Sequence, residues 1–168
     1  MPDSGAAALG DDAVEITRGL LRIDSSNFGD DSGPGEREAA EYAVGQLTDS
    51  GIPADLYTTT SNRRAGVTAH IKGTDKDLAP LLLTGHLDVV PAVPSEWAHP
   101  PFAGEIDDDG VLWGRGAVDM KDMVGMSLAV LRHWHRTGYR PRRSIALLLT
   151  PDEEAGGAHG AHWIVRHR

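Results

Sequence analysis

Three short segments of the chain combine acidic residues with histidine or glycine at places where the backbone is expected to turn. Thr84–Asp88 reads Thr-Gly-His-Leu-Asp and directly follows an apolar run. Thr150–Glu154 reads Thr-Pro-Asp-Glu-Glu and also follows an apolar run, while Gly114–Lys121 contains Asp119 in a glycine-rich setting. Ligands of open α/β sheets bind beyond the carboxyl ends of strands. The segments Thr84–Asp88 and Thr150–Glu154, which follow apolar runs, are therefore expected at a binding site.

The residue types in these segments suit metal chemistry. The chain has no cysteine, so a metal must bind to histidine, aspartate or glutamate. In His86-x-Asp88 the carboxylate can turn back onto the imidazole and leave the other ring nitrogen for a metal. The pair Glu153-Glu154 could divide two tasks, with one acid binding a metal and the other holding or deprotonating a water.

The acidic pair alone is ambiguous, because two acids also suit a solvated helix N-terminus. Burying two acids after an apolar strand is costly unless a cation compensates them. Taken together, His86, Asp119 and Glu154 offer one nitrogen and two carboxylates from three separate parts of the chain. That set suits a zinc or similar divalent site with open coordination positions.

The elements that would position these residues alternate between helices and strands. Apolar residues at helical spacing predict a first helix from Asp11 or Asp12 and a second from about residue 35 to Gly51, after a flexible tail over residues 1–10. The runs at 80–84 and 144–150 are typical of strands buried on both faces. We further expect strands at 52–60 and 66–72, a hairpin at 105–113, and helices at 120–136 and 158–168. This order predicts an α/β fold with a mostly parallel central sheet flanked by helices.

Composition excludes several classes of function. The net charge of −9 and the pI near 5.2 argue against general nucleic-acid binding. No apolar run approaches the ~20 residues of a membrane helix, so no membrane partner is expected. The acidic start Met1-Pro2-Asp3-Ser4 does not resemble a secretory signal, and we therefore expect a cytoplasmic protein.

Three motifs resemble the M20 family of metallopeptidases, which includes aminoacylases, carboxypeptidases, dipeptidases and the succinyl-diaminopimelate and acetylornithine deacylases. They are Gly85–Pro91, Trp113–Lys121 and Asp152–Gly157, in the order of the family. Trp97 and Gly104 in the intervening loop also resemble it. The resemblance covers about residues 11–168 and implies a zinc-exopeptidase-like catalytic domain.

The resemblance also implies a role for each residue. His86 would bind the first metal, Asp119 would bridge two metals, with a cis bond to Met120, and Glu154 would bind the second. The catalytic residues would be Asp88, which orients His86, and Glu153, the general base. The cofactors would be two Zn²⁺ ions about 3.5–4 Å apart, with Co²⁺ or Mn²⁺ as substitutes.

The implied reaction is hydrolysis of the amide or peptide bond in small N-acyl amino acids or short peptides. Glu153 would take a proton from the attacking water and pass it to the departing amine. Members of the family are much longer than 168 residues and carry an additional acidic ligand, a histidine near the C-terminus and a lid domain that pairs subunits. No residues here match those parts, and His159 and His162 are interpreted as surface or packing residues.

We therefore interpret residues 11–168 as the N-terminal portion of a catalytic domain truncated at its C-terminus, lacking the lid or dimerisation domain, with a homodimer expected for the full-length form. The isolated chain would bind zinc weakly and have little activity. The alternative is a non-catalytic truncated remnant or interaction module that retains the fold. A two-metal phosphoester hydrolase is less favoured because the chain has no phosphate-binding loop. A glycosidase built on two carboxylates would not need His86-x-Asp88.

Overall fold

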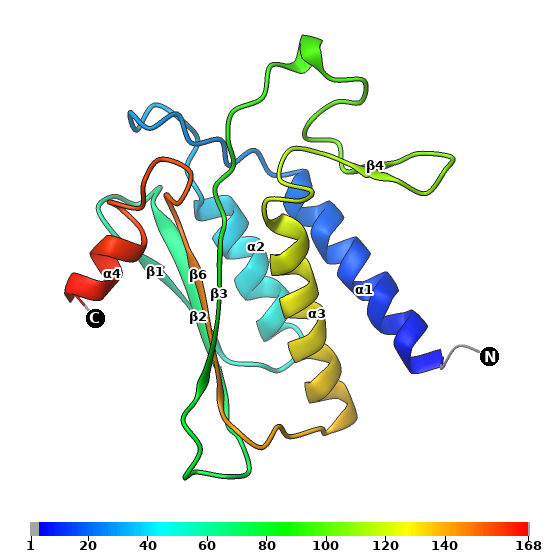
Figure 1. Ribbon diagram of the computed structural model, residues 1–168, viewed down its shortest axis with the longest axis vertical. Coiled ribbons are helices and arrows are strands. Elements are labelled where there is room, and N and C mark those ends of the chain that lie inside the picture. The colour runs from blue at the N-terminus through cyan, green and yellow to red at the C-terminus, as the bar shows by residue number, and fades with distance from the viewer. Residues whose placement is uncertain (1–3, 168) are drawn as a thin grey trace.

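A computed structural model describes residues 4–167, which form helices packed against a four-stranded sheet, with a small hairpin beside them (Figure 1). The α-helices are α1 (Ser4–Leu21), α2 (Arg37–Thr48), α3 (Lys121–Thr137) and α4 (Ala161–His167). The strands of the main sheet are β1 (Ala54–Thr58), β2 (Ala65–Ile71), β3 (Leu81–His86) and β6 (Ile145–Thr150). A 3₁₀ helix covers Pro94–Glu96, and the hairpin consists of β4 (Glu105–Ile106) and β5 (Leu112–Trp113).

The main sheet has the order β1-β2-β6-β3 and is mixed. Strand β3 runs parallel to β6, whereas β1 pairs antiparallel with β2 and β2 antiparallel with β6. The α/β class is confirmed, but the expectation of a mostly parallel sheet is wrong for the described residues. Only residues 59–64 connect β1 to β2, and so short a connection cannot form the crossover that parallel strands need.

Helices α1, α2 and α3 lie together on one side of the sheet (Figure 1). On α3, Val124, Leu128 and Leu131 recur at helical spacing and are almost fully buried. They join a core that includes Leu20 of α1 and Leu149 of β6. This core holds the start of α3 close to the ends of β3 and β6, where the three motifs lie.

The amino-terminal segment differs from its prediction. Helix α1 begins at Ser4, so residues 4–10 are helical rather than a flexible tail, and residues 1–3 lie outside the described part of the chain. Alanine and leucine are strong helix formers, and Leu9 packs against the core. This packing extends the helix upstream of the predicted Asp11 or Asp12 cap.

Strand β3 also differs, because Leu81 and Leu82 are 43% and 54% exposed rather than buried. Strand β3 lies at the edge of the sheet, so neighbouring strands cover it less than they cover β6. Within residues 4–167, no helix has the length and the apolar character that crossing a bilayer requires.

Candidate metal centre

The sheet brings two of the three motifs to one place. In the parallel pair β3–β6, His86 lies opposite Thr150, so the segments that follow these strands leave the sheet side by side. The motif that contains Asp119 arrives from another direction, since Asp119 lies two residues before Lys121, the first residue of α3. The Asp119–Met120 peptide bond is cis, as the family resemblance implied.

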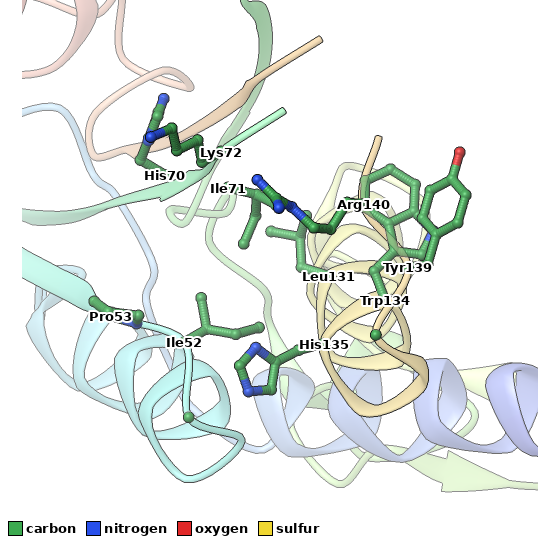
Figure 2. Close-up of a pocket in the computed structure, with 12 residues that line it drawn as sticks. Ile52, Pro53, His70, Ile71, Lys72, Leu131, Trp134, His135, Tyr139 and Arg140 are labelled. Carbon is green, nitrogen blue, oxygen red and sulfur yellow. The ribbon is translucent and has the colours of Figure 1, made fainter. Parts of the chain in front are cut away.

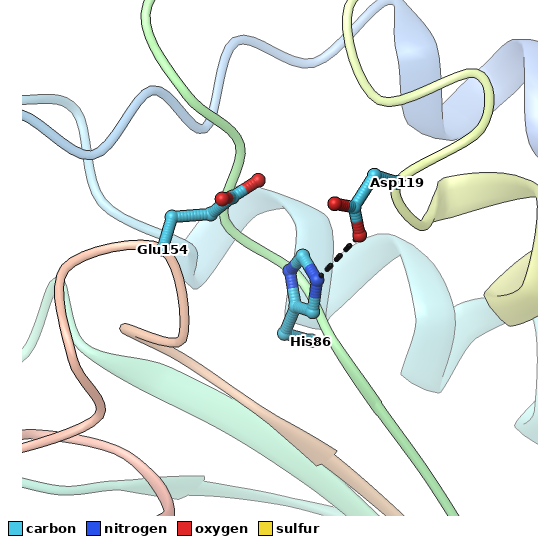
Figure 3. A group of neighbouring side chains, drawn as sticks. All are labelled: His86, Asp119 and Glu154. Carbon is cyan, nitrogen blue, oxygen red and sulfur yellow. Dashed lines mark hydrogen bonds and ion pairs between the residues drawn. The ribbon is translucent and has the colours of Figure 1, made fainter.

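His86, Asp119 and Glu154 form a compact group (Figure 3). One potential ligand atom from each residue lies within 4.8 Å of the others. The Nε2 atom of His86 is 3.1 Å from Oδ1 of Asp119, and Glu154 approaches the imidazole from the other side in Figure 3. The His86 side chain is buried, whereas that of Asp119 is 76% exposed. The group therefore has a buried nitrogen and a side open to solvent.

The hydrogen bonds of His86 define which ring nitrogen is available. Its Nδ1 atom lies 3.0 Å from the main-chain oxygen of Asp88, and a carbonyl oxygen can only accept a hydrogen bond. Nδ1 must therefore carry a hydrogen, which leaves Nε2 as the metal-binding nitrogen of the neutral ring. Nε2 faces a carboxylate oxygen of Asp119, so a cation between the two atoms, either a proton or a metal ion, is needed to join them.

The charges around His86 favour a bound cation. Burial alone would lower the pKa of His86, but the hydrogen bonds and charge of Asp88, together with the hydrogen bond to Asp119, raise that pKa to about 9. Burial and the nearby charges of Asp119 and Asp88 raise the pKa of Glu154, although His86 acts in the opposite direction. The site thus gathers more negative charge than its own residues neutralise.

Asp88 connects the His86 motif to the turn that carries Glu153 and Glu154. Its side chain is fully buried and accepts hydrogen bonds from the backbone N–H groups of Glu153 and Glu154, each at 3.0 Å. Its Oδ1 atom also lies 3.5 Å from Nδ1 of His86. Burial opposes ionisation of Asp88, yet the hydrogen bonds from His86, Asn27 and the two amides hold its pKa below the usual value. Asp88 is thus an anion that touches both the histidine and the acidic turn.

Glu153 lies beside the three-residue group without belonging to it. Its Oε2 atom is 3.8 Å from Nε2 of His86, and its side chain is 61% exposed. Glu153 therefore lies near the potential ligands and is free to contact water or substrate, whereas its neighbour Glu154 points into the group.

On the side away from His86, Asp88 joins a buried polar network that the sequence analysis did not predict. Asn27 donates to Asp88 at 2.8 Å and to Asp152 at 2.9 Å, and Arg64 donates to Asn27 and to the buried Glu36. No local pattern signals these contacts, because Asn27 lies in a segment that reads only as a loop. The pairing of that segment with residues 87–89 is a tertiary feature.

The donor set fits a divalent cation of the zinc type. Zinc binds imidazole nitrogen and carboxylate oxygen, and an open side leaves room for water or substrate. The described residues supply one such nitrogen and two carboxylates in a single group. A bound cation would also satisfy both Nε2 of His86 and the Asp119 oxygen that lies 3.1 Å from it.

Comparison with known proteins identifies relatives of the chain. A sequence model of Peptidase family M20/M25/M40 matches residues 82–168. The N-fatty-acyl-amino acid synthase/hydrolase PM20D1 of Xenopus tropicalis is 34% identical over 156 residues, which cover 90% of this chain and 30% of that protein. Aminoacylase-1 of Dictyostelium discoideum is 32% identical over 145 residues, which cover 86% of this chain and 34% of that protein.

Solved structures give a similar result. The M20 family metallo-carboxypeptidase Sso-CP2 from Sulfolobus solfataricus matches with a TM-score of 0.70 at 28% identity, covering 92% of this chain and 32% of that one. Human carnosine dipeptidase 1 matches with a TM-score of 0.70 at 22% identity, covering 94% and 36%, and shows the shared fold. The chain thus spans only about a third of the length of these relatives.

Proposed function

We propose, on the premise that this chain belongs to Peptidase family M20/M25/M40, that it forms part of a metal-dependent hydrolase of amide or peptide bonds. The observation that carries the proposal is the convergence of His86, Asp119 and Glu154, whose ligand atoms lie within 4.8 Å of one another. Three motifs that are far apart in the sequence meet there without any cysteine or phosphate-binding loop.

The proposed roles follow from the positions of the side chains. His86 would bind a metal through Nε2, and Glu154 would bind through its carboxylate. Asp119 offers two oxygens on the exposed side and would bridge two ions. We propose two Zn²⁺ ions, with Co²⁺ or Mn²⁺ as substitutes. When bound, such cations lower the pKa of a water and polarise a carbonyl oxygen.

The chain's own contribution to catalysis would come from Glu153 and Asp88. Glu153, exposed beside the group, would accept the proton of the attacking water and deliver it to the nitrogen of the leaving amine. Asp88 would keep the Nδ1 hydrogen of His86 and the backbone of the acidic turn in place. The support for these roles is the position of Glu153, 3.8 Å from Nε2 of His86, and the full burial of Asp88.

The proposed substrates are small N-acyl amino acids and short peptides. The support is the identity of the relatives, which include an N-fatty-acyl-amino acid synthase/hydrolase and an aminoacylase. A homodimeric full-length form and a cytoplasmic location stay predictions. So does the alternative of a non-catalytic remnant or interaction module, which the experiment below would favour if no hydrolysis were found.

The test is metal binding combined with hydrolysis. The purified protein is freed of metal with a chelator and titrated with Zn²⁺, Co²⁺ or Mn²⁺, and the release of amino acid from acyl-amino acids and dipeptides is measured. Because the isolated chain is expected to bind zinc weakly, we expect slow hydrolysis that depends on added metal. His86→Ala should lose both metal and this activity, whereas His133→Ala on helix α3 should lose neither. Equal metal binding by His86→Ala and the unaltered protein would refute the site.

A further inference from the structure

Two buried acids share one amide side chain. The carboxylates of Asp88 and Asp152 are 0% and 2% exposed, respectively, and an oxygen of each accepts a hydrogen bond from Nδ2 of Asn27. Nδ2 carries two hydrogens, so each carboxylate receives one of them. Asn27 therefore separates two buried negative groups that would otherwise face each other without a shared donor.

The orientation of the Asn27 amide is fixed by its other end. The Oδ1 atom accepts hydrogen bonds from the backbone N–H of Gly29 at 3.0 Å and from the guanidinium of Arg64 at 3.2 Å. Turning the amide over would direct Nδ2 at the Arg64 guanidinium and Oδ1 at two carboxylates. Only the observed orientation matches every donor with an acceptor.

The backbone of Asn27 is held as firmly as its side chain. Its N–H donates to the main-chain oxygen of Val89 at 2.9 Å, and Ser26 forms a parallel bridge with Val89. The hydroxyl of Ser25 donates to the oxygen of Leu87 at 2.7 Å. The loop that carries Asn27 is thus tied to the segment that carries Asp88.

The buried guanidinium of Arg64 holds the Asn27 side chain through a hydrogen bond to its Oδ1 atom. The Arg64 side chain is 6% exposed and is surrounded by the carboxylates of Glu36, Asp31 and Asp152. These three acids fix the guanidinium plane, and one of its nitrogens reaches Oδ1 of Asn27. A chain of contacts therefore leads from Arg64 through Asn27 to Asp88, and from Asp88 to His86 and the amides of Glu153 and Glu154.

We propose that Asn27, held by Arg64, is a positioning residue that sets the orientation of Asp88 and of the Glu153–Glu154 turn behind the metal centre. The proposal rests on the proposed function only for its effect on metal binding and turnover. Partners behind the ligands of a metal site commonly change metal affinity or activity about 10- to 100-fold when they are removed. Asn27 contacts none of the proposed metal ligands directly, so we expect its removal to change metal affinity and activity by about tenfold, the lower end of this range.

The decisive variant is Asn27→Asp, which has nearly the same shape but replaces the donor Nδ2 with an acceptor. The matched control is Arg63→Ala. Arg63 is the exposed neighbour of Arg64 and donates to the backbone oxygens of Gly33 and Asp31, so its loss loosens the same loop but removes no side-chain contact of Arg64 or Asn27. Zn²⁺ affinity is measured by competition with a chromophoric chelator, and the amide resonances of Glu153 and Glu154 are recorded by NMR in metal-free protein.

Asn27→Asp is expected to weaken Zn²⁺ binding about tenfold and to lower kcat to a similar degree, with KM changed less than about twofold. Its Glu153 and Glu154 amide resonances should move upfield as their hydrogen bonds to Asp88 weaken. Arg63→Ala should keep the Zn²⁺ affinity and the two resonances. If Asn27→Asp does not fold, Asn27→Ser removes the donor pair without adding a charge and serves in its place.

The two proposals fail in different ways. Unchanged amide resonances and unchanged Zn²⁺ affinity in the folded Asn27 variant would overturn the positioning role, even if the unaltered protein hydrolyses its substrate. Absence of metal binding and hydrolysis in the unaltered protein would overturn the proposed function. The positioning of Asp88 would still be decided by the metal-free resonances.

Discussion

The two ends of strand β6 organise their polar residues in opposite ways. At the carboxyl end, Asp88 and Asp152 are buried, and both accept hydrogen bonds from the side chain of Asn27. At the amino end lies a cavity of about 350 Å³ with an apolar floor that includes Leu131 and Trp134 (Figure 2).

The cavity carries its polar groups at the rim. Residues His70, Lys72, His135 and Arg140 line it from β2, α3 and the segments that follow them, and all four are exposed. Exposed polar side chains keep their hydration and need no partner, whereas buried acids must be bonded or neutralised. Burial and hydrogen bonding of polar groups, and not the volume of a cavity, therefore distinguish the candidate site in this fold.

The strongest loss of turnover is expected when Glu153, the proposed general base, is changed and the proposed metal ligand Glu154 is kept. Glu153→Gln keeps the size of the side chain but cannot accept a proton, so turnover should fall about 10²- to 10⁴-fold while Zn²⁺ binding persists. Steady-state hydrolysis and metal counts on the same preparation measure this. The control Glu38→Gln alters an exposed acid of α2 and should leave both unchanged. Loss of metal together with activity in Glu153→Gln would mean that Glu153 is a ligand.

An intermediate effect concerns the cost of burying acids in the network. Burial raises the pKa of Glu36 to about 7, with Asp88 acting in the same direction and Arg64 against it. Below about pH 4.5 Glu36 is protonated in both the folded and unfolded states. Between about pH 4.5 and 7 the unfolded state ionises first, so folding loses stability as the pH rises, by up to about 3 kcal/mol, and the loss is complete above pH 7.

The measurement is the free energy of urea unfolding from pH 4.5 to 8, in chelator, for the unaltered protein and for Glu36→Gln. The unfolding free energy of the unaltered protein minus that of the variant should decrease across this range. Glu38→Gln, which removes an exposed acid two residues away, should show no such trend. A flat difference for Glu36→Gln would mean that the buried carboxylate is fully neutralised by Arg64 at every pH.

The smallest effect is expected at the opposite end of the sheet. His135 is exposed at the cavity rim, so His135→Ala should change the unfolding free energy by less than about 0.5 kcal/mol. Thermal unfolding and hydrolysis rates measure the change. A loss of activity comparable to that of Asn27→Asp would show that the two ends of β6 are coupled, and that the cavity at the amino end contributes to the candidate site.

Much of the local structure could be read from the sequence. The apolar run at 144–150 predicts β6, which spans Ile145–Thr150, and the helical periodicity after Met120 predicts α3, which spans Lys121–Thr137. The hairpin around Asp108-Asp109-Gly110 also formed as expected, with Glu105 opposite Trp113. These elements depend on periodicity and turn residues, which neighbouring positions in the chain supply.

The predictions that failed depended on distant contacts. The start of α1 at Ser4 is decided in part by packing of Leu9 on the core, and the exposure of Leu82 by the edge position of β3. The direction of β2 relative to β6 is likewise invisible in either strand alone. Sequence periodicity reports which faces a segment can bury, but not which partner covers them.

The chemical types of the site follow from the amino-acid sequence alone, because three motifs supply the nitrogen of His86 and the carboxylates of Asp119, Glu153 and Glu154 without any thiolate. Folding alone brings ligand atoms of His86, Asp119 and Glu154 within 4.8 Å of one another and places Asn27 and Arg64 behind them. The type of each residue is independent of the fold, whereas a contact between distant residues is not. The hydrogen bond between Asn27 and Asp152 joins residues 125 positions apart, and such a contact exists only after the chain has folded.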